Sequence, residues 1–362
     1  MPWVVAVLLV CLANCSSGDG DGTGPRSDAP ITVMPEQGLT GFAERLDGIR
    51  VDLQIPGMGA AIGRDGQIVW AEGFGYANAE TERPATSRTP FHLASLTKPF
   101  GATILMQLVE DGLVNLDDPV GDYGVELSSP GTIRVRHLLT HTSEGTPGTR
   151  YAYNGNRFAD LDRVIESASG QTFVSLLHEQ ILRPLGLEDT APNPLDESAF
   201  EVTGMDREAF AAEMASGYAL EGSAIERLDH PDYFGVSAGL VASADDVVRF
   251  SMAIDDGQFL KAETWEQVFT PAVSNSGATL AYGLGWFIFE HEDLMIQWHY
   301  GHWTNKSSLI VRVPRERLTF VVVAISHQLC AAYGVGGDNI VLRSAVDRIF
   351  IETDVRGDEA LP

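Results

Sequence analysis

Phe91-His92-Leu93-Ala94-Ser95-Leu96-Thr97-Lys98 is the stretch on which the organisation of this chain depends. It places Ser95 and Lys98 three residues apart, at the point where a long apolar helix begins. Side chains at this spacing share one helical face, so the amine can reach the hydroxyl and take its proton. A free lysine has a pKa of about 10.4, so Lys98 acts as a base at neutral pH only where burial or neighbouring charge lowers that pKa.

Lysine is rare in this chain, and this rarity draws attention to Lys98. It is one of three lysines, the others being Lys261 and Lys306, and it stands among apolar residues instead of on a charged face. A serine three residues before a lysine is also common on surface helices, so the pair alone leaves a purely structural role open. The rest of the chain has to decide between the two interpretations.

The composition is that of a globular protein. The chain has 362 residues, 44% of them hydrophobic and 20% charged, enough for one large core or two fused lobes. Its formal net charge of -26 and pI near 4.5 argue against a nucleic-acid partner and against direct adsorption to anionic lipid, because like charges repel. Solubility in a salty or extracellular medium explains the acidity more directly than an acidic binding site does.

The amino-terminal end has the pattern of an export signal. Residues 3–13 form an apolar run that is too short to span a bilayer but suits the core of a signal peptide, which we expect over residues 1–14. The run ends in Leu12-Ala13-Asn14-Cys15, which resembles a bacterial lipobox, although Asn14 replaces the usual small residue and no Lys or Arg precedes the run. We therefore expect an exported, periplasmic protein that contacts a membrane only through a lipid on Cys15, at the outer membrane.

A flexible tether is expected to follow, over residues 15–40, because its first part consists largely of Ser, Gly and Asp. A catalytic domain over residues 41–355 and a tail over 356–362 complete the expected organisation. With Cys15 lipidated, Cys330 is the remaining cysteine of the mature chain, so no internal disulfide is expected.

The first secondary structure of the domain is a predicted hairpin. Two apolar runs between residues 57 and 76 flank Arg64-Asp65-Gly66-Gln67, and Asp-Gly between strand-like segments favours a tight turn. The helix after Ser95 is indicated by apolar residues at helical spacing, and Gly112 is its expected end. Pro99 conflicts with a helix that begins at this stretch, because it lacks a backbone donor and disfavours helical geometry at Lys98.

The remaining periodicity predicts an α+β fold. Two amphipathic helices are expected at 161–169 and 173–182, within a mostly helical lobe over about 100–235 that is inserted between two parts of the sheet. The carboxy-terminal patterns, listed in order, are strands at 281–289, 294–300, 307–313 and 318–325 and a closing helix at 339–351. Together they predict an antiparallel β-sheet flanked by helices.

Six short motifs then identify a resemblance that covers about residues 41–352. They are Ser95-Leu96-Thr97-Lys98, Leu138-Leu139-Thr140-His141-Thr142-Ser143, Pro184-Leu185-Gly186-Leu187-Glu188-Asp189-Thr190, Ala238-Gly239-Leu240-Val241-Ala242-Ser243, Tyr282-Gly283-Leu284-Gly285-Trp286 and His299-Tyr300-Gly301. In this order they resemble the serine β-lactamase-related family, which includes class C β-lactamases, D-stereospecific peptidases and esterases. The motifs are specific jointly, and none of them is specific alone.

The resemblance implies a third catalytic residue, a tyrosine that exchanges protons with the nucleophile and the leaving group. Tyr153 stands at the matching position, and Gly155 stands where the family usually has an asparagine. Asn154 or Asn156 is a candidate to supply the missing amide, and the sequence does not choose between them. A role for Tyr153 as a packing aromatic alongside Tyr151 also stays open.

The resemblance further places His299-Tyr300-Gly301 on a strand at the edge of the site. Classical penicillin-recognising enzymes have a lysine at the first position, which attracts the substrate's carboxylate, whereas a histidine resembles some D-peptidases and esterases. Gly301 would let the substrate approach the backbone. The implied oxyanion hole consists of the backbone N–H groups of Ser95 and His302, with the His302 side chain expected only to pack.

Two rival motifs are weaker. Gly235-Val236-Ser237-Ala238-Gly239 matches the nucleophile elbow of α/β-hydrolases, but polar residues precede it and the next helix begins several residues too late. His137 and His141 have a spacing able to hold zinc, but no glutamate stands between them as in metalloprotease helices. We therefore expect no cofactor and no metal.

The functional hypothesis is an exported serine hydrolase that acts through an acyl-enzyme on esters or D-amino-acid peptides, with β-lactams as a further substrate class and small-molecule or peptidoglycan-like substrates as partners. The alternative from another class is a catalytically degenerate, penicillin-binding-like protein of the same fold. The sequence says nothing of the oligomeric state.

Overall fold

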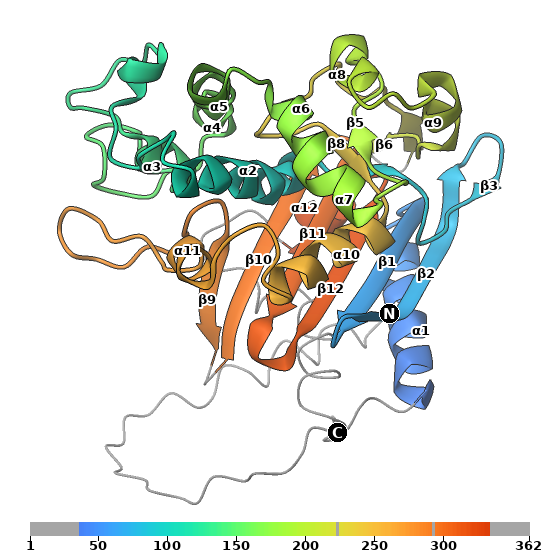
Figure 1. Ribbon diagram of the computed structural model, residues 1–362. Helices are drawn as coiled ribbons and strands as arrows, with labels where there is room; N and C mark the ends of the chain where they lie inside the picture. The colour runs from blue at the N-terminus through green and yellow to red at the C-terminus, as the bar shows by residue number, and fades with distance from the viewer. Residues whose placement is uncertain (1–35, 222–223, 292–293, 334–362) are drawn as a thin grey trace, which may run out of the picture. The chain divides into compact units, whose positions relative to one another are not determined.

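One antiparallel sheet organises the part of the chain that the computed structural model describes, residues 36–221, 224–291 and 294–333. Its seven strands lie in the order β3-β2-β1-β12-β11-β10-β9 (Figure 1). Their bounds are β1 Gly57–Arg64, β2 Gln67–Asn78, β3 Arg83–Pro84, β9 Phe287–His291, β10 Leu294–Trp303, β11 Lys306–Val313 and β12 Leu318–Ala324. Because β1 pairs with β12, sequence from both ends of the domain forms the centre of the sheet.

The predicted hairpin of β1 and β2 is confirmed, and its turn shows why. Asp65 and Gly66 both have positive φ, 50° and 77°, which is the geometry of a type I′ turn. This turn matches the right-handed twist of paired strands, and Asp-Gly is one of its preferred sequences. The type of turn is therefore specified by two neighbouring residues, and the Asp65 N–H also donates to the Arg317 carbonyl over 3.1 Å.

Helices cover both faces of the sheet and create two cores. On one face, α1 (Glu36–Asp52) buries Phe42 and Leu46 against Met58, Ile62 and Phe320. On the other face lie α2 (Lys98–Glu110), α10 (Ala244–Asp255) and α11 (Ala262–Val268), over the alternate residues of the same strands. Both faces of β1 and β12 are thus buried, and these strands read as continuous apolar runs. The predicted α+β class is confirmed.

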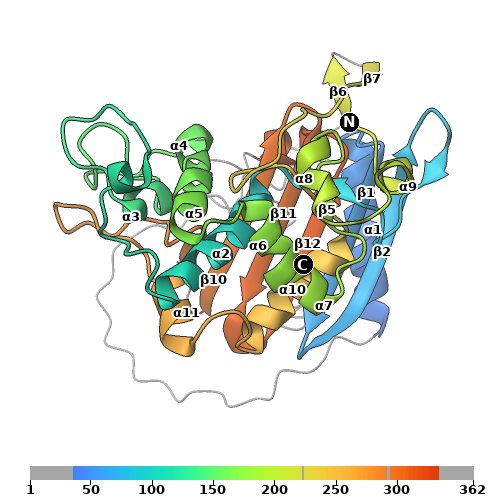
Figure 2. The same cartoon turned by 45° about the horizontal axis from the view of Figure 1, so that its top comes forward.

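A group of short helices lies around α2, on the same side of the sheet (Figures 1 and 2). They are α3 Val135–Leu139, α4 Gly155–Ala159, α5 Leu161–Ser169, α6 Phe173–Leu177, α7 Arg183–Leu185, α8 Glu197–Glu201 and α9 Arg207–Glu213. The helix predicted at 161–169 is confirmed as α5. The helix predicted at 173–182 is also present, with α6 continuing through a π-helical turn, His178–Leu182, into α7.

Smaller pieces of sheet and a last helix complete the described fold. A three-stranded sheet has the order β4-β8-β5, with β4 Phe91–His92, β8 Leu240–Ala242 and β5 Ala191–Pro192, and β6 Tyr218–Glu221 pairs with β7 Ala224–Arg227. The helix α12 (Gln328–Tyr333) buries Leu329 and Cys330 in the same core as α1. Strand β4 leads directly to the turn that contains Ser95, so the small sheet positions this serine.

Two sequence predictions need correction. The strand predicted at 281–289 begins only at Phe287, because Gly285 has a φ of 83° and a Cβ there would lie 2.4 Å from the Cβ of Ala102, which makes this segment a turn against α2. The tether predicted over 15–40 is too long at its end, because α1 begins at Glu36. The predicted signal peptide, Cys15, the rest of the tether, the closing helix at 339–351 and the tail lie outside the described residues.

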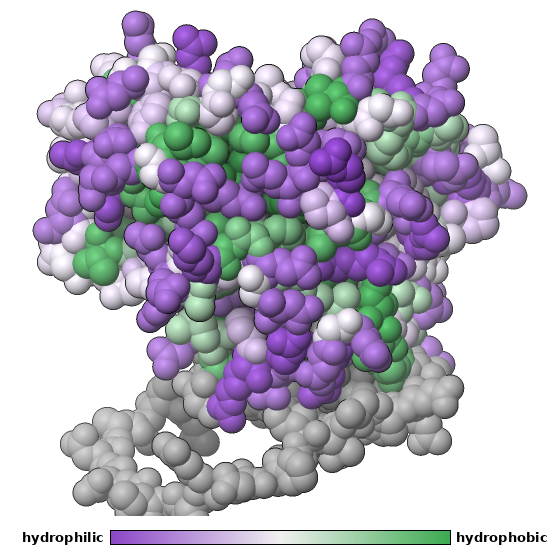
Figure 3. Space-filling view, in the orientation of Figure 1, coloured by the Kyte–Doolittle hydropathy of each residue, from purple (hydrophilic) through white to green (hydrophobic). Residues whose placement is uncertain are grey.

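The visible surface in Figure 3 is mostly hydrophilic, with hydrophobic patches between polar side chains. The exposed large apolar side chains include Val273, which is 63% exposed, and Val51, which is 56% exposed. No described helix combines the length and apolarity needed to cross a bilayer.

Candidate active site

Ser95 lies in a 3₁₀ turn, Ala94–Thr97, immediately before α2. Ala94 has a φ of 49°, which is unusual for a residue other than glycine. Two hydrogen bonds hold this conformation: the Ala94 N–H donates to His92 Nδ1 over 3.0 Å, and Thr97 Oγ1 donates to the Ala94 carbonyl over 2.7 Å. Ser95 is the one residue between 91 and 100 that is not fully buried, so the turn presents its hydroxyl at the surface.

The 3₁₀ turn also explains how Lys98 reaches Ser95. Side chains three residues apart eclipse each other in this geometry. The Nζ atom of Lys98 lies 3.0 Å from Ser95 Oγ and donates to the carbonyl of Ser237 over 2.8 Å. Lys98 is 1% exposed, and this burial lowers the pKa of its amine to about 7. The amine is therefore a base near neutral pH, held against a hydroxyl.

Pro99 causes no difficulty, because it is the second residue of α2. The first four N–H groups of an α-helix have no partner within the helix, so the missing donor costs nothing there. The long helix expected at this stretch begins at Lys98, and Ser95 stands in the 3₁₀ turn before it.

Tyr153 lies next to this pair. Lys98 Nζ is 5.1 Å from the centre of its ring, and the ring packs 4.2 Å from that of His141. Burial raises the pKa of the Tyr153 phenol above its usual value, as does Tyr300, while the neighbouring Ser95 hydroxyl acts in the opposite direction. Within the described residues its buried hydroxyl makes no hydrogen bond of standard geometry. Tyr153 is thus a protonated phenol beside Ser95 and also a packed aromatic.

The two candidate asparagines differ clearly. Asn154 caps α4, because its Oδ1 accepts from the Arg157 N–H over 3.0 Å, and its Nδ2 donates to Glu144. Asn156 is exposed on α4. Between them, a Cβ added to Gly155 would point at Lys98, 3.8 Å from Nζ. Asn154 is therefore engaged elsewhere, and a substrate-binding role for Asn156 stays a prediction.

His299 is buried, and its contacts define its protonation state. Nδ1 lies 2.8 Å from the Tyr300 carbonyl, which only accepts, so Nδ1 carries the proton. Nε2 then accepts from the Tyr282 hydroxyl, 2.9 Å away. Burial, followed by the charge of Lys98, lowers the pKa of this ring well below its usual value. In this arrangement neither ring nitrogen is free for a substrate carboxylate. The resemblance had implied a substrate-binding role for His299.

Gly301 is required by the fold for a reason that differs from the predicted one. A Cβ at this position would lie 1.9 Å from the Leu93 carbonyl oxygen and 2.3 Å from Ser308 Oγ, so glycine lets β10 approach the stretch before Ser95. His302 is exposed, with its ring 6.3 Å from that of His327. The oxyanion hole formed by the N–H groups of Ser95 and His302 stays a prediction.

The pairing of the outer strand leaves an edge beside Ser95. Strand β9 pairs with β10 only from Leu294 to Trp298. Beyond that point, residues 299–303 of β10 pair with β11 on one side and have no β9 partner on the other. The 3₁₀ turn that bears Ser95 packs against β10, so this serine lies beside the strand that β9 covers only in part.

Both rival motifs have structural roles. The segment around Ser237 is followed by strand β8, and the next helix begins only at Ala244, so it lacks the strand-turn-helix of a nucleophile elbow. His137 Nδ1 accepts from the Arg134 N–H, and His141 Nδ1 accepts from the Asn154 N–H over 3.2 Å. Within the described ranges no group of three metal-ligating side chains comes together.

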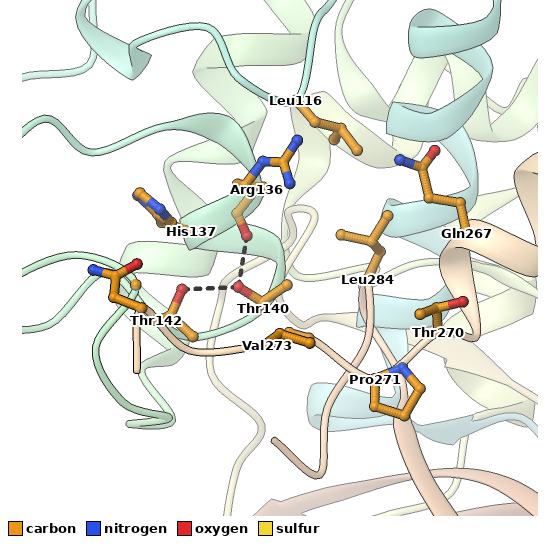
Figure 4. A pocket seen from close by; sticks show the side chains of 13 residues that line it. Leu116, Arg136, His137, Thr140, Thr142, Gln267, Thr270, Pro271, Val273 and Leu284 are labelled. Atoms are coloured by element: carbon orange, nitrogen blue, oxygen red, sulfur yellow. Dashed lines mark hydrogen bonds between the residues drawn. The ribbon is translucent and has the colours of Figure 1, made fainter. Parts of the chain in front are cut away.

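A separate hollow of about 470 Å³ lies behind the loop that carries His141 (Figure 4). It is lined by Leu116, Arg136, Thr140, Thr142, Leu284 and the loop after α11, and Ser95, Lys98 and Tyr153 do not line it. The hydroxyl of Thr140 donates to the Arg136 carbonyl over 2.7 Å, so this wall is internally bonded. The cluster of Ser95, Lys98 and Tyr153 therefore stands outside this hollow.

Sequence reasoning missed three residues of the site. The Ser237 carbonyl, the positive φ of Ala94 and the ring of His141 beneath Tyr153 all contribute to it. A backbone carbonyl carries no residue-type signal. His141 offered one signal, since it lies within a motif that the resemblance rests on, and it has a φ of 51°.

The sheet, the helical group and the serine-lysine-tyrosine cluster define a serine-hydrolase type of fold and site. The model of the family described as Beta-lactamase matches residues 42–329. The chain therefore belongs to the beta-lactamase family, whose members include serine hydrolases of several kinds.

Similar proteins agree with this assignment. Penicillin-binding protein 4* of Bacillus subtilis (strain 168) is 26% identical over 305 residues, 72% of this chain and 66% of that protein. A D-aminopeptidase of Gluconobacter oxydans (strain 621H) is 26% identical over 342 residues, 81% of this chain and 63% of that protein. The octameric penicillin-binding protein homologue from Pyrococcus abyssi has a TM-score of 0.69 at 23% identity, over 83% of this chain and 78% of that chain, which shows the fold. The chain spans 61 to 66% of the length of the first curated relatives that it matches.

Proposed function

We propose that this chain is a hydrolase that forms an acyl-enzyme on Ser95 and acts on esters or D-amino-acid peptides in preference to β-lactams. The observation that carries the proposal is the Lys98 amine, buried, with a pKa of about 7, and 3.0 Å from Ser95 Oγ. A serine hydroxyl becomes nucleophilic where a positioned base takes its proton.

The chemistry follows from these contacts. Neutral Lys98 takes the proton of Ser95 as Oγ attacks the substrate carbonyl, and the N–H groups of Ser95 and His302 stabilise the oxyanion. Tyr153, protonated at neutral pH, passes a proton to the leaving group and is reprotonated from the Lys98 ammonium. Water then attacks the acyl-enzyme, Lys98 takes its proton, and this proton returns to Ser95 as the acid product leaves. One bond of the substrate and one of water are broken in each cycle.

The lower preference for β-lactams rests on His299. A β-lactam carries a carboxylate that needs a cation or strong donors close by. His299 is neutral, with Nδ1 bonded to the Tyr300 carbonyl and Nε2 to Tyr282, so it supplies neither. The D-aminopeptidase among the relatives supports peptide substrates, whereas the penicillin-binding protein is named for a β-lactam, and neither decides between peptides and esters.

A panel of substrates tests the proposal. A chromogenic cephalosporin, short-chain nitrophenyl esters and D-alanyl peptides are compared with wild type and with Ser95→Ala. We expect Ser95-dependent turnover of an ester or peptide to exceed that of the cephalosporin. Serine-dependent cephalosporin turnover above that of every other substrate would overturn the substrate class, and absence of all turnover and all fluorophosphonate labelling would favour the degenerate binding protein.

We also propose that the protein is exported and anchored by a lipid on Cys15. The support is the apolar run at 3–13 and the lipobox-like Leu12-Ala13-Asn14-Cys15. Residues between this point and α1 would hold the domain off the membrane.

A further inference from the structure

The Ser237 carbonyl, which binds Lys98, belongs to a segment that is held from α5. Both carboxylate oxygens of Asp162 lie within hydrogen-bond distance of the Val236 N–H, at 2.9 and 3.2 Å. Asp162 follows Leu161, the first residue of α5, and is far from Val236 along the chain. Burial raises the pKa of its carboxyl to about 7, and the bond from Val236 acts in the opposite direction, so this bond favours the carboxylate.

The neighbouring atoms show that this contact is closely fitted. A Cβ at Gly235 would lie 2.5 Å from Asp162 Oδ2 and 2.5 Å from the Tyr233 hydroxyl, so only glycine admits both groups. On the opposite side, a Cβ at Gly101 of α2 would lie 2.3 Å from Val236 Cγ2 and 2.8 Å from the Val236 carbonyl oxygen. Val236 is therefore fixed between α5 and α2.

The same segment also contacts Lys98, the proposed catalytic base. The Val236 N–H shares a rigid peptide plane with the Gly235 carbonyl, and the Ser237 carbonyl shares one with the Ala238 N–H. The Ala238 N–H donates to the Gly235 carbonyl over 3.2 Å, so the two planes are joined and holding the first restrains the second. The Ser237 carbonyl accepts from Lys98 over 2.8 Å, and the same amine is 3.0 Å from Ser95 Oγ. An amine that donates to this carbonyl has its remaining bonds and its lone pair oriented by it.

We propose, given the function proposed above, that Asp162 is a positioning residue that acts through the Val236 N–H to hold the Ser237 carbonyl against Lys98 and so aims the amine at Ser95. It touches neither the substrate nor the reacting atoms. The side-chain oxygens of Asp162 belong to α5, so their bond to the Val236 N–H holds the segment from a separate element of the fold.

Titration of Lys98 itself tests this without any substrate. The chain has three lysines, so ¹³C labelling of the lysine Cε gives three signals, and Lys98→Met identifies the relevant one. The titratable groups that face Lys98 are Tyr153, His141 and His299, all uncharged near neutral pH because burial raises the pKa of the phenol and lowers those of the rings. The facing groups of Asp162 are Asp160, Glu166 and Tyr233.

The expected results distinguish orientation from charge. Asp162→Ala frees the Ser237 carbonyl, so the Lys98 ammonium loses an acceptor and its pKa falls by at least about half a unit. Asp162→Asn keeps an oxygen acceptor for Val236 and should leave the titration near that of wild type. Gly235→Ala keeps the carboxylate but displaces it, and should lower the Lys98 pKa as Asp162→Ala does. This second variant tests the same contact if Asp162→Ala fails to fold.

The matched control is Asp246→Ala, which removes another buried carboxylate that accepts a backbone N–H, from Asp189 over 3.0 Å. It should leave the Lys98 titration unchanged. In turnover, Asp162→Ala should lower kcat by tenfold to about a hundredfold with little change in KM, since displacement of a catalytic group has effects of this order. An unchanged Lys98 pKa in both Asp162→Ala and Gly235→Ala, or an equal shift in Asp162→Asn, would overturn the positioning role. Failure of wild type to hydrolyse any substrate would refute the proposed function. The titration of Lys98 would still decide whether Asp162 positions its amine.

Discussion

A carboxylate placed beside Lys98 should disable the site at neutral pH and restore it in base. Gly155→Asp is the change, because a Cβ at this position would lie 3.8 Å from Lys98 Nζ in open, unstrained geometry. Gly155 is also the first residue of α4, where an acidic side chain is favourable. Gly155→Asn is the matched control, since it has nearly the same shape without the charge.

The magnitude follows from the burial of Lys98. Its pKa is about 7, because burial disfavours the ammonium form. An opposite charge within reach raises the pKa of such a group by roughly 1 to 3 units, so about 9 is expected in Gly155→Asp. At pH 7 the neutral fraction of the amine then falls from about one half to about 1%, an activity loss of about fiftyfold.

The assay is kcat/KM for a short-chain nitrophenyl ester between about pH 5 and pH 10, with Ser95→Ala as the blank for spontaneous hydrolysis. Because the neutral amine is the active form, a raised pKa moves the acid limb of the profile toward higher pH. Activity of Gly155→Asp should approach that of wild type at the alkaline end, and Gly155→Asn should keep the wild-type limb. An acid limb that stays in place in Gly155→Asp would refute Lys98 as the base.

Three further results are expected. Lys98→Met should raise the free energy of unfolding at pH 7 by about 2 to 3 kcal/mol. Lowering the pKa of Lys98 from 10.5 to about 7 on folding costs the wild type about 5 kcal/mol, and the loss of the hydrogen bond to Ser237 in the variant offsets part of the gain. Urea unfolding should show the gain fading as pH rises from about 7 to 10.5, and a gain that is independent of pH would contradict the burial argument. His299→Lys should raise the ratio of cephalosporin to ester turnover by tenfold or more, roughly the value of one charge-assisted bond, and an unchanged ratio would remove His299 from specificity. Mass spectrometry of the mature amino terminus should find a lipidated Cys15, whereas an unmodified terminus beyond it would leave export without an anchor.

The parts of the fold that were predicted correctly depend on local sequence patterns. The Asp65-Gly66 turn and the spacing of Ser95 and Lys98 each depend on a few adjacent residues, so the hairpin and the contact between Ser95 and Lys98 could be found without knowledge of distant contacts. The strand that was predicted to begin at residue 281 shows the limit of prediction from local patterns. Its apolar residues read as a strand, and only the close approach of Gly285 to Ala102 explains why the segment turns.

The parts that sequence could not supply depend on long-range contacts. Lys98 meets the Ser237 carbonyl across a separation of 139 residues, and Asp162 meets Val236 across 74. The first contact uses a backbone atom that every residue has, and the second joins an ordinary helical aspartate to an ordinary amide. The neutral state of His299 likewise follows only from its contacts with Tyr282 and Tyr300.

The central claim is that Ser95 forms the acyl-enzyme, and covalent labelling measures this directly. Wild type, Ser95→Ala and Ser237→Ala are treated with a fluorophosphonate, followed by intact mass measurement and peptide mapping. Ser237→Ala is the matched control, because it removes a second buried hydroxyl near Lys98 and keeps the carbonyl that binds the amine. One adduct on the peptide that contains Ser95 is expected in wild type and in Ser237→Ala, and none in Ser95→Ala. Labelling that survives Ser95→Ala and disappears in Ser237→Ala would contradict the account.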